Sequence, residues 1–149
     1  GIIAYNRQEF KCIDDMNGEI CNQWNAKVSN RDVVWHLGDV AFGKEYIHIL
    51  DQLNGIKHLV LGNHDTYNME LYKQYFNKIR GMCYWRNCIL SHMPVHPGQL
   101  GVRAKYNIHG HIHNSNHRIC DERYICANID TFDNYAPKTF EELIEWNKP

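Results

Sequence analysis

DVVWHLGDVAFG, residues 32–43, joins a short apolar run to a glycine and a cluster of polar residues. Its first part, Asp32–Leu37, is rich in valine and predicts a buried strand that ends at Gly38. KHLVLGNHD, residues 57–65, repeats the arrangement, with a strand at Lys57–Leu61 that again ends at a glycine. A strand, then a glycine, then polar side chains is therefore the unit from which we interpret the fold.

Helices and further strands are expected around these two strands. Three segments have apolar residues at spacings of three and four, as amphipathic helices do: residues 8–28, 44–53 and 67–79. Three more segments have strand-like patterns: Met82–Leu90, Lys105–Ile108 and Arg123–Ile129. Thr139 followed by Glu142 predicts a last helix that begins with a capping box. This order predicts an α/β fold with mixed sheets, and no repeat or linker divides the single domain expected over residues 1–149.

Composition places the chain among ordinary folded proteins. Of its 149 residues, 44% are hydrophobic and 22% are charged, which excludes disorder and coiled coil. The formal net charge of -1 gives no support for nucleic-acid binding through bulk positive charge. No apolar run approaches the roughly 20 residues that cross a bilayer, so no membrane association is expected. Six cysteines without a Cys-x-x-Cys pair or a signal-peptide pattern lead us to expect reduced thiols and a cytoplasmic protein.

Polar residues follow four of the expected strands, at the point where each strand ends. Asp39 follows VVWHLG, the run Asn63–Asp65 follows HLVLG, His92 follows CILS, and the pair His111 and His113 follows YNIHG. In open α/β sheets, ligands bind at the carboxyl ends of the strands. We therefore expect these four segments, distant in the sequence, to converge on one site.

The residue types suit a divalent transition metal. A carboxylate, an amide oxygen and several imidazoles offer the mixed nitrogen and oxygen donors that Mn, Fe, Zn, Ni or Co prefer over Ca. His111 and His113 are two residues apart, so in an extended stretch their side chains point to the same side. One such cluster alone is weak evidence, whereas four at strand ends are strong evidence for a metal site, with manganese as the first expectation.

The ordered series GDVAFG, GNHD, SHMP and GHIH resembles the calcineurin-like metallophosphoesterase superfamily, in particular a compact bacterial and phage branch of it. The resemblance implies a layered sandwich of two mixed β-sheets flanked by helices, and a centre of two metal ions that binds phosphate and activates a bridging hydroxide. It also implies a role for each matching residue: Asp39 bridging both metals, Asn63, His92 and His111 on the second metal, His113 on the first, His64 beside the phosphate, and Asp65 orienting His64. A leaving alkoxide needs a proton, and the imidazole of His64, next to Asp65, can donate it. The Asp65 carboxylate alternatively fixes the backbone turn.

One departure from the family pattern concerns the first metal. In the family, the opening strand carries an Asp-x-His motif that holds this ion, and no such motif precedes Asp39 here. GIIAYNRQEF, residues 1–10, matches what normally follows it, so we expect the first strand to be missing, either because the native N-terminus is absent or because the protein is a shortened member. We expect one ion to bind well and the other, left with Asp39 and His113, to bind poorly.

Two further residues are candidate substrate contacts. Arg7 lies in YNRQEF, and its forked donors suit a phosphate oxygen, although an ion pair with an acidic neighbour serves its charge equally well. His96 follows Pro94 in a loop that could overhang the site.

The resemblance implies metal-dependent hydrolysis of a phosphodiester or phosphomonoester. GDVAFG lacks the second Asp and the Arg of the Ser/Thr-phosphatase signature, so a small phosphoester is the expected partner rather than a phosphoprotein. The alternative is a metal- or phosphate-binding module with little turnover, because the Asp-x-His motif is absent. The sequence leaves the oligomeric state open.

Overall fold

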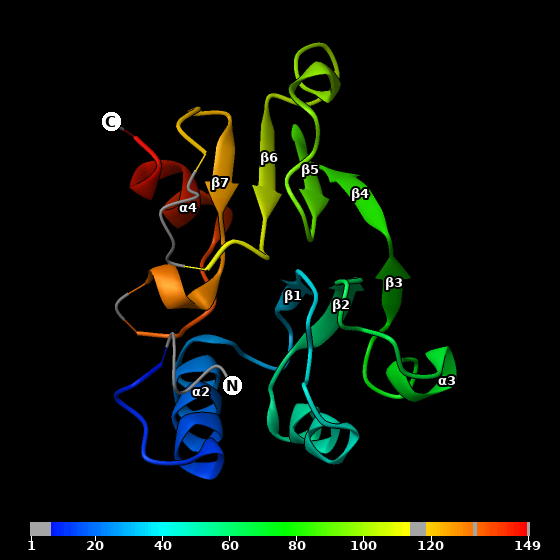
Figure 1. The fold of residues 1–149 in the computed structure, drawn as a ribbon, viewed down its shortest axis with the longest axis vertical. Coiled ribbons are helices and arrows are strands. Elements are labelled where there is room, and N and C mark those ends of the chain that lie inside the picture. Colours follow the sequence, from blue (N-terminus) through cyan, green and yellow to red (C-terminus); the bar gives the residue numbers. More distant parts are fainter. Residues whose placement is uncertain (1–6, 114–118, 133, 149) are drawn as a thin grey trace.

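The computed structural model describes residues 7–113, 119–132 and 134–148. Two sheets form the body of the molecule (Figure 1). Sheet A has the order β1-β2-β3, and its three strands are parallel: β1 (Val33–His36), β2 (Ile56–Val60) and β3 (Lys78–Arg80). Sheet B has the order β4-β5-β6-β7: β4 (Met82–Trp85), β5 (Cys88–Ser91), β6 (Tyr106–His109) and β7 (Tyr124–Cys126). Only β4 runs antiparallel to its neighbour, so sheet B is mixed.

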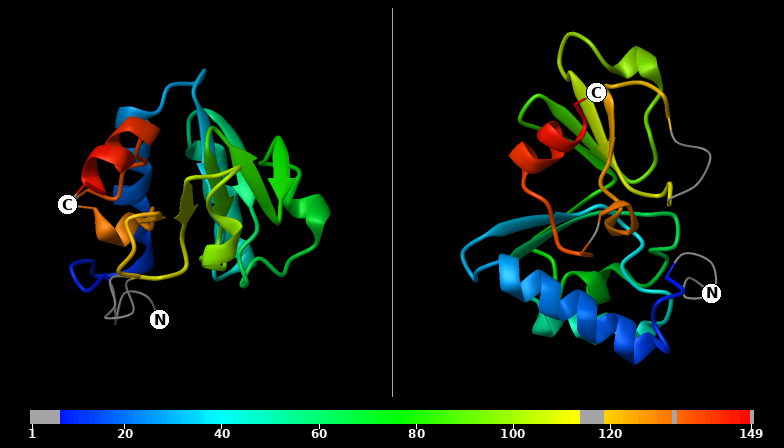
Figure 2. Two further views of the ribbon diagram at one scale, coloured as in Figure 1. Left: turned by 90° about the horizontal axis from the view of Figure 1, so that it is seen from above. Right: turned by 90° about the vertical axis from the view of Figure 1, so that its left-hand side faces the viewer.

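Helices lie beside both sheets. The α-helices described are α2 (Ile13–Lys27), α3 (Met69–Tyr72) and α4 (Phe140–Trp146). Short 3₁₀ helices occur at η1 (Lys44–Gln52), η2 (Pro97–Gln99) and η3 (Ile129–Thr131). Figure 2 shows α2 running beneath sheet A and α4 lying beside sheet B. Among the helices of the described residues, none combines the length and apolar character needed to cross a membrane.

Two hydrophobic cores lie on the opposite faces of sheet A. Leu59 and Val60 are neighbours on β2 and are fully buried, but successive strand residues point to opposite faces. Leu59 packs in a core with α2, η1 and α3, to which Trp24, Leu50 and Tyr72 contribute. Val60 packs in a second core with sheet B and α4, formed by Cys88, Leu90, Ile108, Ile125 and Leu143. Sheet A is therefore the middle layer of the molecule.

The predicted two-sheet α/β architecture is confirmed, and the capping box at the last helix is present. Thr139 accepts a hydrogen bond from the backbone N–H of Glu142, and the Glu142 carboxylate accepts one from the backbone N–H of Thr139. These reciprocal bonds satisfy two donors that the helix itself leaves without acceptors. Local sequence signals therefore determine the start of α4.

The helix predicted over residues 67–79 is wrong for most of its length. Only α3 is helical, and Lys78–Arg80 form β3, which pairs with β2. Asn77 donates its backbone N–H to the Lys57 carbonyl at 2.8 Å, which starts this pairing. The strand predicted over residues 82–90 is likewise two strands, joined at Arg86, whose φ of 45° reverses the chain. In both cases contacts between strands determine the structure more strongly than local periodicity.

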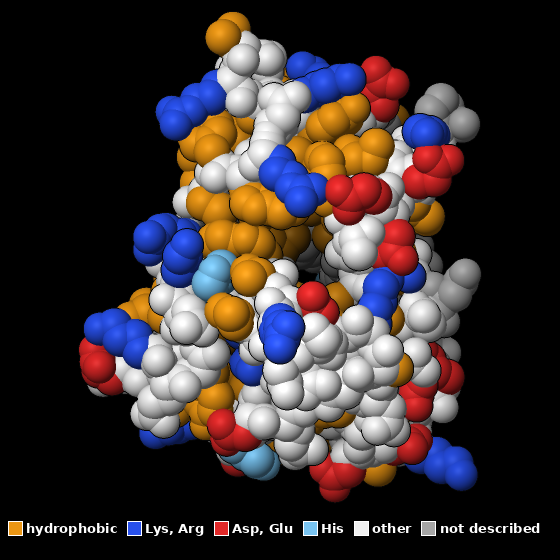
Figure 3. All heavy atoms as spheres, turned by 180° about the vertical axis from the view of Figure 1, so that it is seen from behind, with side chains coloured by type: hydrophobic (Ala, Val, Ile, Leu, Met, Phe, Trp, Pro, Cys, Tyr) orange, Lys and Arg blue, Asp and Glu red, His pale blue; other side chains and the backbone are white. Residues whose placement is uncertain are grey.

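The strand directions bring the carboxyl ends of strands from both sheets together. In Figure 1, β2 and β3 point toward sheet B, whereas β5, β6 and β7 point toward sheet A. Their carboxyl ends consequently meet in the middle of the molecule, between the two sheets. On the face shown in Figure 3, hydrophobic side chains gather over the half of the molecule that contains sheet B, and the other half is mostly polar.

Candidate metal centre

The structure brings four of the predicted ligands together. Nε2 of His92 lies 3.1 Å from Nδ1 of His111, 3.0 Å from Oδ1 of Asn63 and 3.4 Å from Oδ2 of Asp39. Ligand atoms of Asp39, His92 and His111 all lie within 4.8 Å of one another. These side chains follow β1, β2, β5 and β6, so the cluster stands where the carboxyl ends of the strands meet.

The donor chemistry of this cluster fits a cation. Nδ1 of His92 lies 2.6 Å from the Leu37 carbonyl, which can only accept, so this nitrogen carries the ring proton. Nε2 of His92 then presents a lone pair to the other three side chains. A proton on Nδ1 of His111 satisfies one of these contacts, but the oxygens of Asp39 and Asn63 still face a lone pair. A divalent metal ion satisfies all four ligand atoms at once.

The backbone around Asp39 is held in an uncommon conformation. Gly38 has a φ of +94°, and Asp39 itself has a φ of 56°. A Cβ on Gly38 would lie 2.4 Å from the backbone nitrogen of Gly62, so the loops after β1 and β2 touch at these glycines. The Asp39 carboxylate adds a further link because it accepts a hydrogen bond from the backbone N–H of His64 at 3.0 Å. The two loops are therefore joined at the cluster.

Asp65 makes most of the contacts that join these loops. Its carboxylate accepts hydrogen bonds from the backbone N–H groups of Asp39 and Gly62 at 2.8 Å each, and of Val40 at 2.9 Å. Burial, together with the nearby Asp65 carboxylate, raises the pKa of Tyr72 to about 12. These contacts favour the role in which Asp65 fixes the backbone turn over the role in which it orients His64.

Burial lowers the pKa values of three histidines in this region. Burial and the neighbouring His92 lower the pKa of His111 below the ordinary histidine value. Burial also lowers the pKa values of His36 and His109, which lie on β1 and β6 behind the cluster. A neutral imidazole is the form that binds a metal, so the site favours the ligating form of His111.

His113 is held by Asp130, which the sequence interpretation did not select. Its Nδ1 lies 2.5 Å from Oδ2 of Asp130, and Oδ1 of Asp130 accepts a hydrogen bond from Nε of Arg7 at 2.6 Å. Burial alone would raise the pKa of Asp130, but the hydrogen bond from His113 and the charge of Arg7 hold it below its ordinary value. Asp130 comes after β7, so the rule that polar residues follow strand ends could have found it. The sequence pattern placed the end of this strand at Ile129, whereas β7 ends at Cys126.

The remaining predicted site residues lie as follows. Arg7 is bound to Asp130, and its side chain is only 11% exposed. His64 is exposed next to Asn63, with its ring 4.9 Å from the ring of Phe42. His96 caps η2 at the end of sheet B that lies away from the cluster (Figure 1), so the structure does not bring it to the site.

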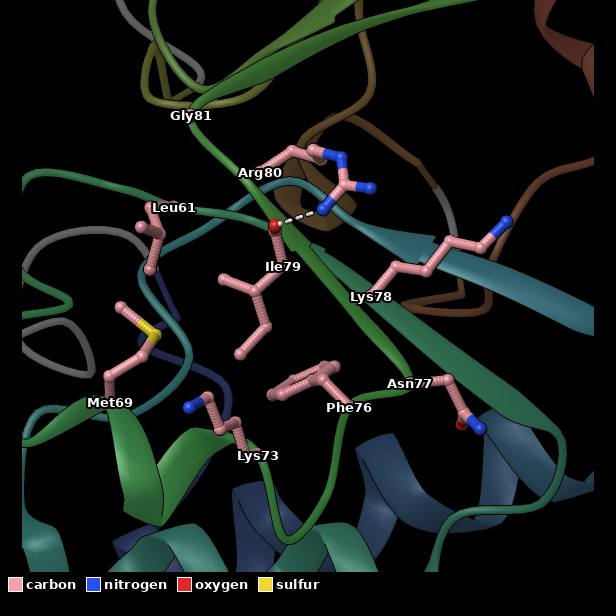
Figure 4. A pocket seen from close by; sticks show the side chains of 9 residues that line it. All are labelled: Leu61, Met69, Lys73, Phe76, Asn77, Lys78, Ile79, Arg80 and Gly81. Atoms are coloured by element: carbon pink, nitrogen blue, oxygen red, sulfur yellow. Dashed lines mark hydrogen bonds between the residues drawn. The ribbon is translucent and has the colours of Figure 1, made fainter.

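A shallow pocket of about 400 Å³ lies between α3 and β3, apart from the cluster (Figure 4). It combines apolar side chains with basic ones, and its lining comprises Leu61, Met69, Lys73, Phe76, Asn77, Lys78, Ile79, Arg80 and Gly81. Leu61 directly precedes Gly62, so this pocket adjoins the loop that carries Asn63. None of the lining residues belongs to the cluster of ligand atoms.

Comparison with known proteins identifies the family. A family model described as calcineurin-like phosphoesterase matches residues 10–148. The chain belongs to the calcineurin-like phosphoesterase family. The cluster formed by Asp39, Asn63, His92 and His111 is therefore the candidate metal centre of a calcineurin-like phosphoesterase.

Two similar proteins extend this comparison. An uncharacterized protein of Methanocaldococcus jannaschii is 30% identical over 120 residues, which cover 78% of this chain and 63% of the relative. The chain therefore spans less than two thirds of the length of that relative. The crystal structure of a protein of unknown function from Aquifex aeolicus is also similar, with a TM-score of 0.72 and 22% sequence identity. The match covers 97% of this chain and 91% of the Aquifex aeolicus chain. This second likeness shows the fold.

Proposed function

We propose that this calcineurin-like phosphoesterase hydrolyses a small phosphodiester or phosphomonoester in a metal-dependent reaction. The observation that supports the proposal is the convergence of two imidazoles, an amide oxygen and a carboxylate on one point, where their lone pairs face one another. Such a set of donors fits a divalent transition metal, and manganese is our first choice, ahead of Fe, Zn, Ni and Co.

The residues of this chain would hold the metal unequally. Asp39, Asn63, His92 and His111 form one compact set of ligand atoms, and His113 stands beside it on the loop after β6. We propose that one ion binds well at the compact set and that a second binds weakly with Asp39 and His113. A bound divalent metal supplies a nucleophile by lowering the pKa of water and stabilises charge on a phosphoryl oxygen.

His64 is the proposed proton donor for the leaving oxygen. Its backbone N–H is bound by Asp39, which places the residue at the edge of the cluster, while its ring stays exposed. A protonated imidazole can deliver a proton to an alkoxide. The Phe42 ring lies against this imidazole, with 4.9 Å between the ring centres.

The test combines metal binding with hydrolysis. Purified protein is first stripped with a chelator, then titrated with Mn²⁺, and assayed with bis(p-nitrophenyl) phosphate and p-nitrophenyl phosphate. We expect binding and turnover in the wild-type chain, and loss of both in His92→Ala and His111→Ala. His48→Ala is the matched control, because His48 is an exposed histidine on η1.

His64→Ala separates binding from chemistry. We expect it to bind Mn²⁺ like the wild type and to lose about 100-fold or more in turnover, as removal of a general acid does. Metal binding without hydrolysis in the wild type would favour the alternative of a metal- or phosphate-binding module. Absence of Mn²⁺ binding would contradict the proposed function itself.

A further inference from the structure

The Asp130 carboxylate is buried between two basic side chains. Its side chain is 2% exposed, and each of its oxygens has its own partner: Nε of Arg7 at 2.6 Å and Nδ1 of His113 at 2.5 Å. Isolated carboxylates are almost never buried to this degree, because desolvation is costly unless the charge is paired and hydrogen-bonded. Arg7 and His113 supply this pairing and hydrogen bonding.

Three segments that are distant in the sequence contribute to this arrangement. Asp130 lies on η3 after β7, and His113 lies on the loop after the parallel neighbour β6. Arg7 precedes α2, and its Nη1 lies 3.3 Å from Sδ of Met16 on that helix. The guanidinium also lies 5.7 Å from the centre of the Tyr135 ring. Arg7 is thus fixed on several sides and is not free to move toward a ligand.

We propose that Asp130 is a positioning residue: it holds the His113 ring with the ring proton on Nδ1, so that Nε2 is the nitrogen offered to the metal centre. Arg7 balances the charge of Asp130. This inference rests on the proposed function, because it takes His113 to be a metal ligand. The ring nitrogen that a histidine offers to a metal is determined by the hydrogen bond of the other nitrogen, and a carboxylate partner also makes the ligand more basic.

Two other roles for Asp130 fit the contacts less well. As a direct metal ligand, Asp130 would have to share oxygens that already accept from Arg7 and His113, at a side chain that is only 2% exposed. As a purely structural ion pair, it would need only Arg7, and the short contact with His113 would have no function. The experiments below separate the positioning role from this structural one.

The first experiment needs no variant. Long-range ¹H–¹⁵N spectra of the metal-free wild-type chain, at mildly alkaline pH, report which ring nitrogen of His113 is protonated, and His113→Ala assigns the signal. We expect the proton on Nδ1. A proton on Nε2 in the wild type would overturn the proposal.

The second experiment measures metal affinity in a mutant cycle. Mn²⁺ is titrated by calorimetry into Asp130→Ala, into His113→Ala and into the double variant. We expect Asp130→Ala to lose about 10- to 100-fold in affinity for the ion that His113 contacts, as loss of the partner of a ligating histidine does. His113→Ala removes the ligand itself and should lose at least as much. The double variant should then bind no more weakly than His113→Ala, because Asp130 acts through His113.

Controls make the two outcomes distinguishable. Asp121→Ala removes an ion pair with Arg123 at the opposite end of β7 and should leave Mn²⁺ affinity unchanged. If Asp130→Ala does not fold, Asp130→Asn keeps the volume and one acceptor and replaces it in the cycle. Wild-type affinity in Asp130→Ala, or additive losses in the double variant, would overturn the positioning role while leaving the proposed function intact. A wild-type chain that binds no Mn²⁺ would contradict the proposed function, and the spectra would still decide how His113 is held.

Discussion

Replacing Asp65 by asparagine tests whether the loops after β1 and β2 are held together by one side chain. In the native structure, one oxygen of Asp65 accepts from the backbone N–H groups of Asp39 and Gly62, and the other accepts from that of Val40. Asparagine has only one acceptor oxygen, and its NH₂ group cannot accept a hydrogen bond. In the better of its two orientations, the amide therefore leaves the N–H of Val40 without its acceptor.

The magnitude follows from the number and kind of bonds lost. A hydrogen bond to a charged group contributes about 1.5–3 kcal/mol net, and a buried donor left without an acceptor costs about 1–3 kcal/mol. One backbone bond is lost, two others change from charged to neutral acceptors, and the Tyr72 hydroxyl, 3.5 Å from the replaced oxygen, can accept from the new NH₂ group. We therefore expect Asp65→Asn to lower the free energy of unfolding by about 2–4 kcal/mol. The candidate metal centre should weaken with it, because Asp39 and Asn63 lie on the joined loops.

The assay is urea unfolding of chelator-treated protein, followed by Mn²⁺ titration under conditions where each variant is folded. Asp32→Asn is the control, because the Asp32 carboxylate accepts from the backbone N–H of Ser29 in an exposed turn. We expect this control to cost less than about 1 kcal/mol and to leave metal affinity unchanged. If the free energy of unfolding of Asp65→Asn is within about 0.5 kcal/mol of the wild-type value, Asp65 does not hold the two loops together, and its role in orienting His64 is favoured instead.

Two further perturbations test neighbouring features of the structure. Gly38→Ala should destabilise the chain by about 2 kcal/mol or more, because Gly38 has a φ of +94° and a Cβ there would lie 2.4 Å from a backbone nitrogen. Gly18→Ala in α2 is the counterpart: a Cβ there meets nothing within 4 Å, so this variant should be more stable by about 0.5–1 kcal/mol in the same urea assay. Thr139→Ala should cost about 1 kcal/mol at neutral pH through loss of the α4 cap. Hydrogen bonds from Lys27 and from the Thr139 backbone lower the pKa of Glu142. The stability that the Glu142 carboxylate contributes is therefore complete above the unfolded carboxyl pKa and is lost as pH falls through the lower folded value. Urea unfolding at neutral and at acidic pH measures this loss, and an effect of Thr139→Ala that grows on acidification would contradict it.

The sequence predicts the convergence of the candidate ligands well where the signal is local. Asp39, Asn63, His92 and His111 each follow an apolar strand directly, so their convergence depends only on the strands ending where the apolar runs end. The same local signals predict the cap of α4. These features are determined within a few residues of chain, which is why periodicity and glycine positions suffice to find them.

Other features depend on contacts that the sequence pattern does not contain. Lys78–Arg80 become a strand because they pair with β2, although their apolar spacing continues that of a helix. Asp130 acquires its role because β6 and β7 are neighbours, which places it beside His113. The loop with His96 turns away because Asn107 and Tyr124 bind Val95, and neither contact is visible from the loop itself.

The left-handed backbone at two candidate ligands leads to a last prediction. Asp39 and His111 have φ angles of 56° and 61°, a conformation that costs a residue with a Cβ about 1–2 kcal/mol. Such local strain is found where the surrounding structure holds a functional residue in place. His111→Ala and His111→Gly both remove the imidazole, but only glycine adopts this φ without cost.

In the metal-free chain we therefore expect the free energy of unfolding of His111→Gly to be about 0.5–1 kcal/mol higher than that of His111→Ala. The reverse order is expected at His109, which is buried within strand β6, where glycine is less stable than alanine. Urea unfolding of the four variants measures both differences. If His111→Ala were as stable as His111→Gly, the backbone at this ligand would not be strained, and the arrangement of the site would not come at the expense of stability.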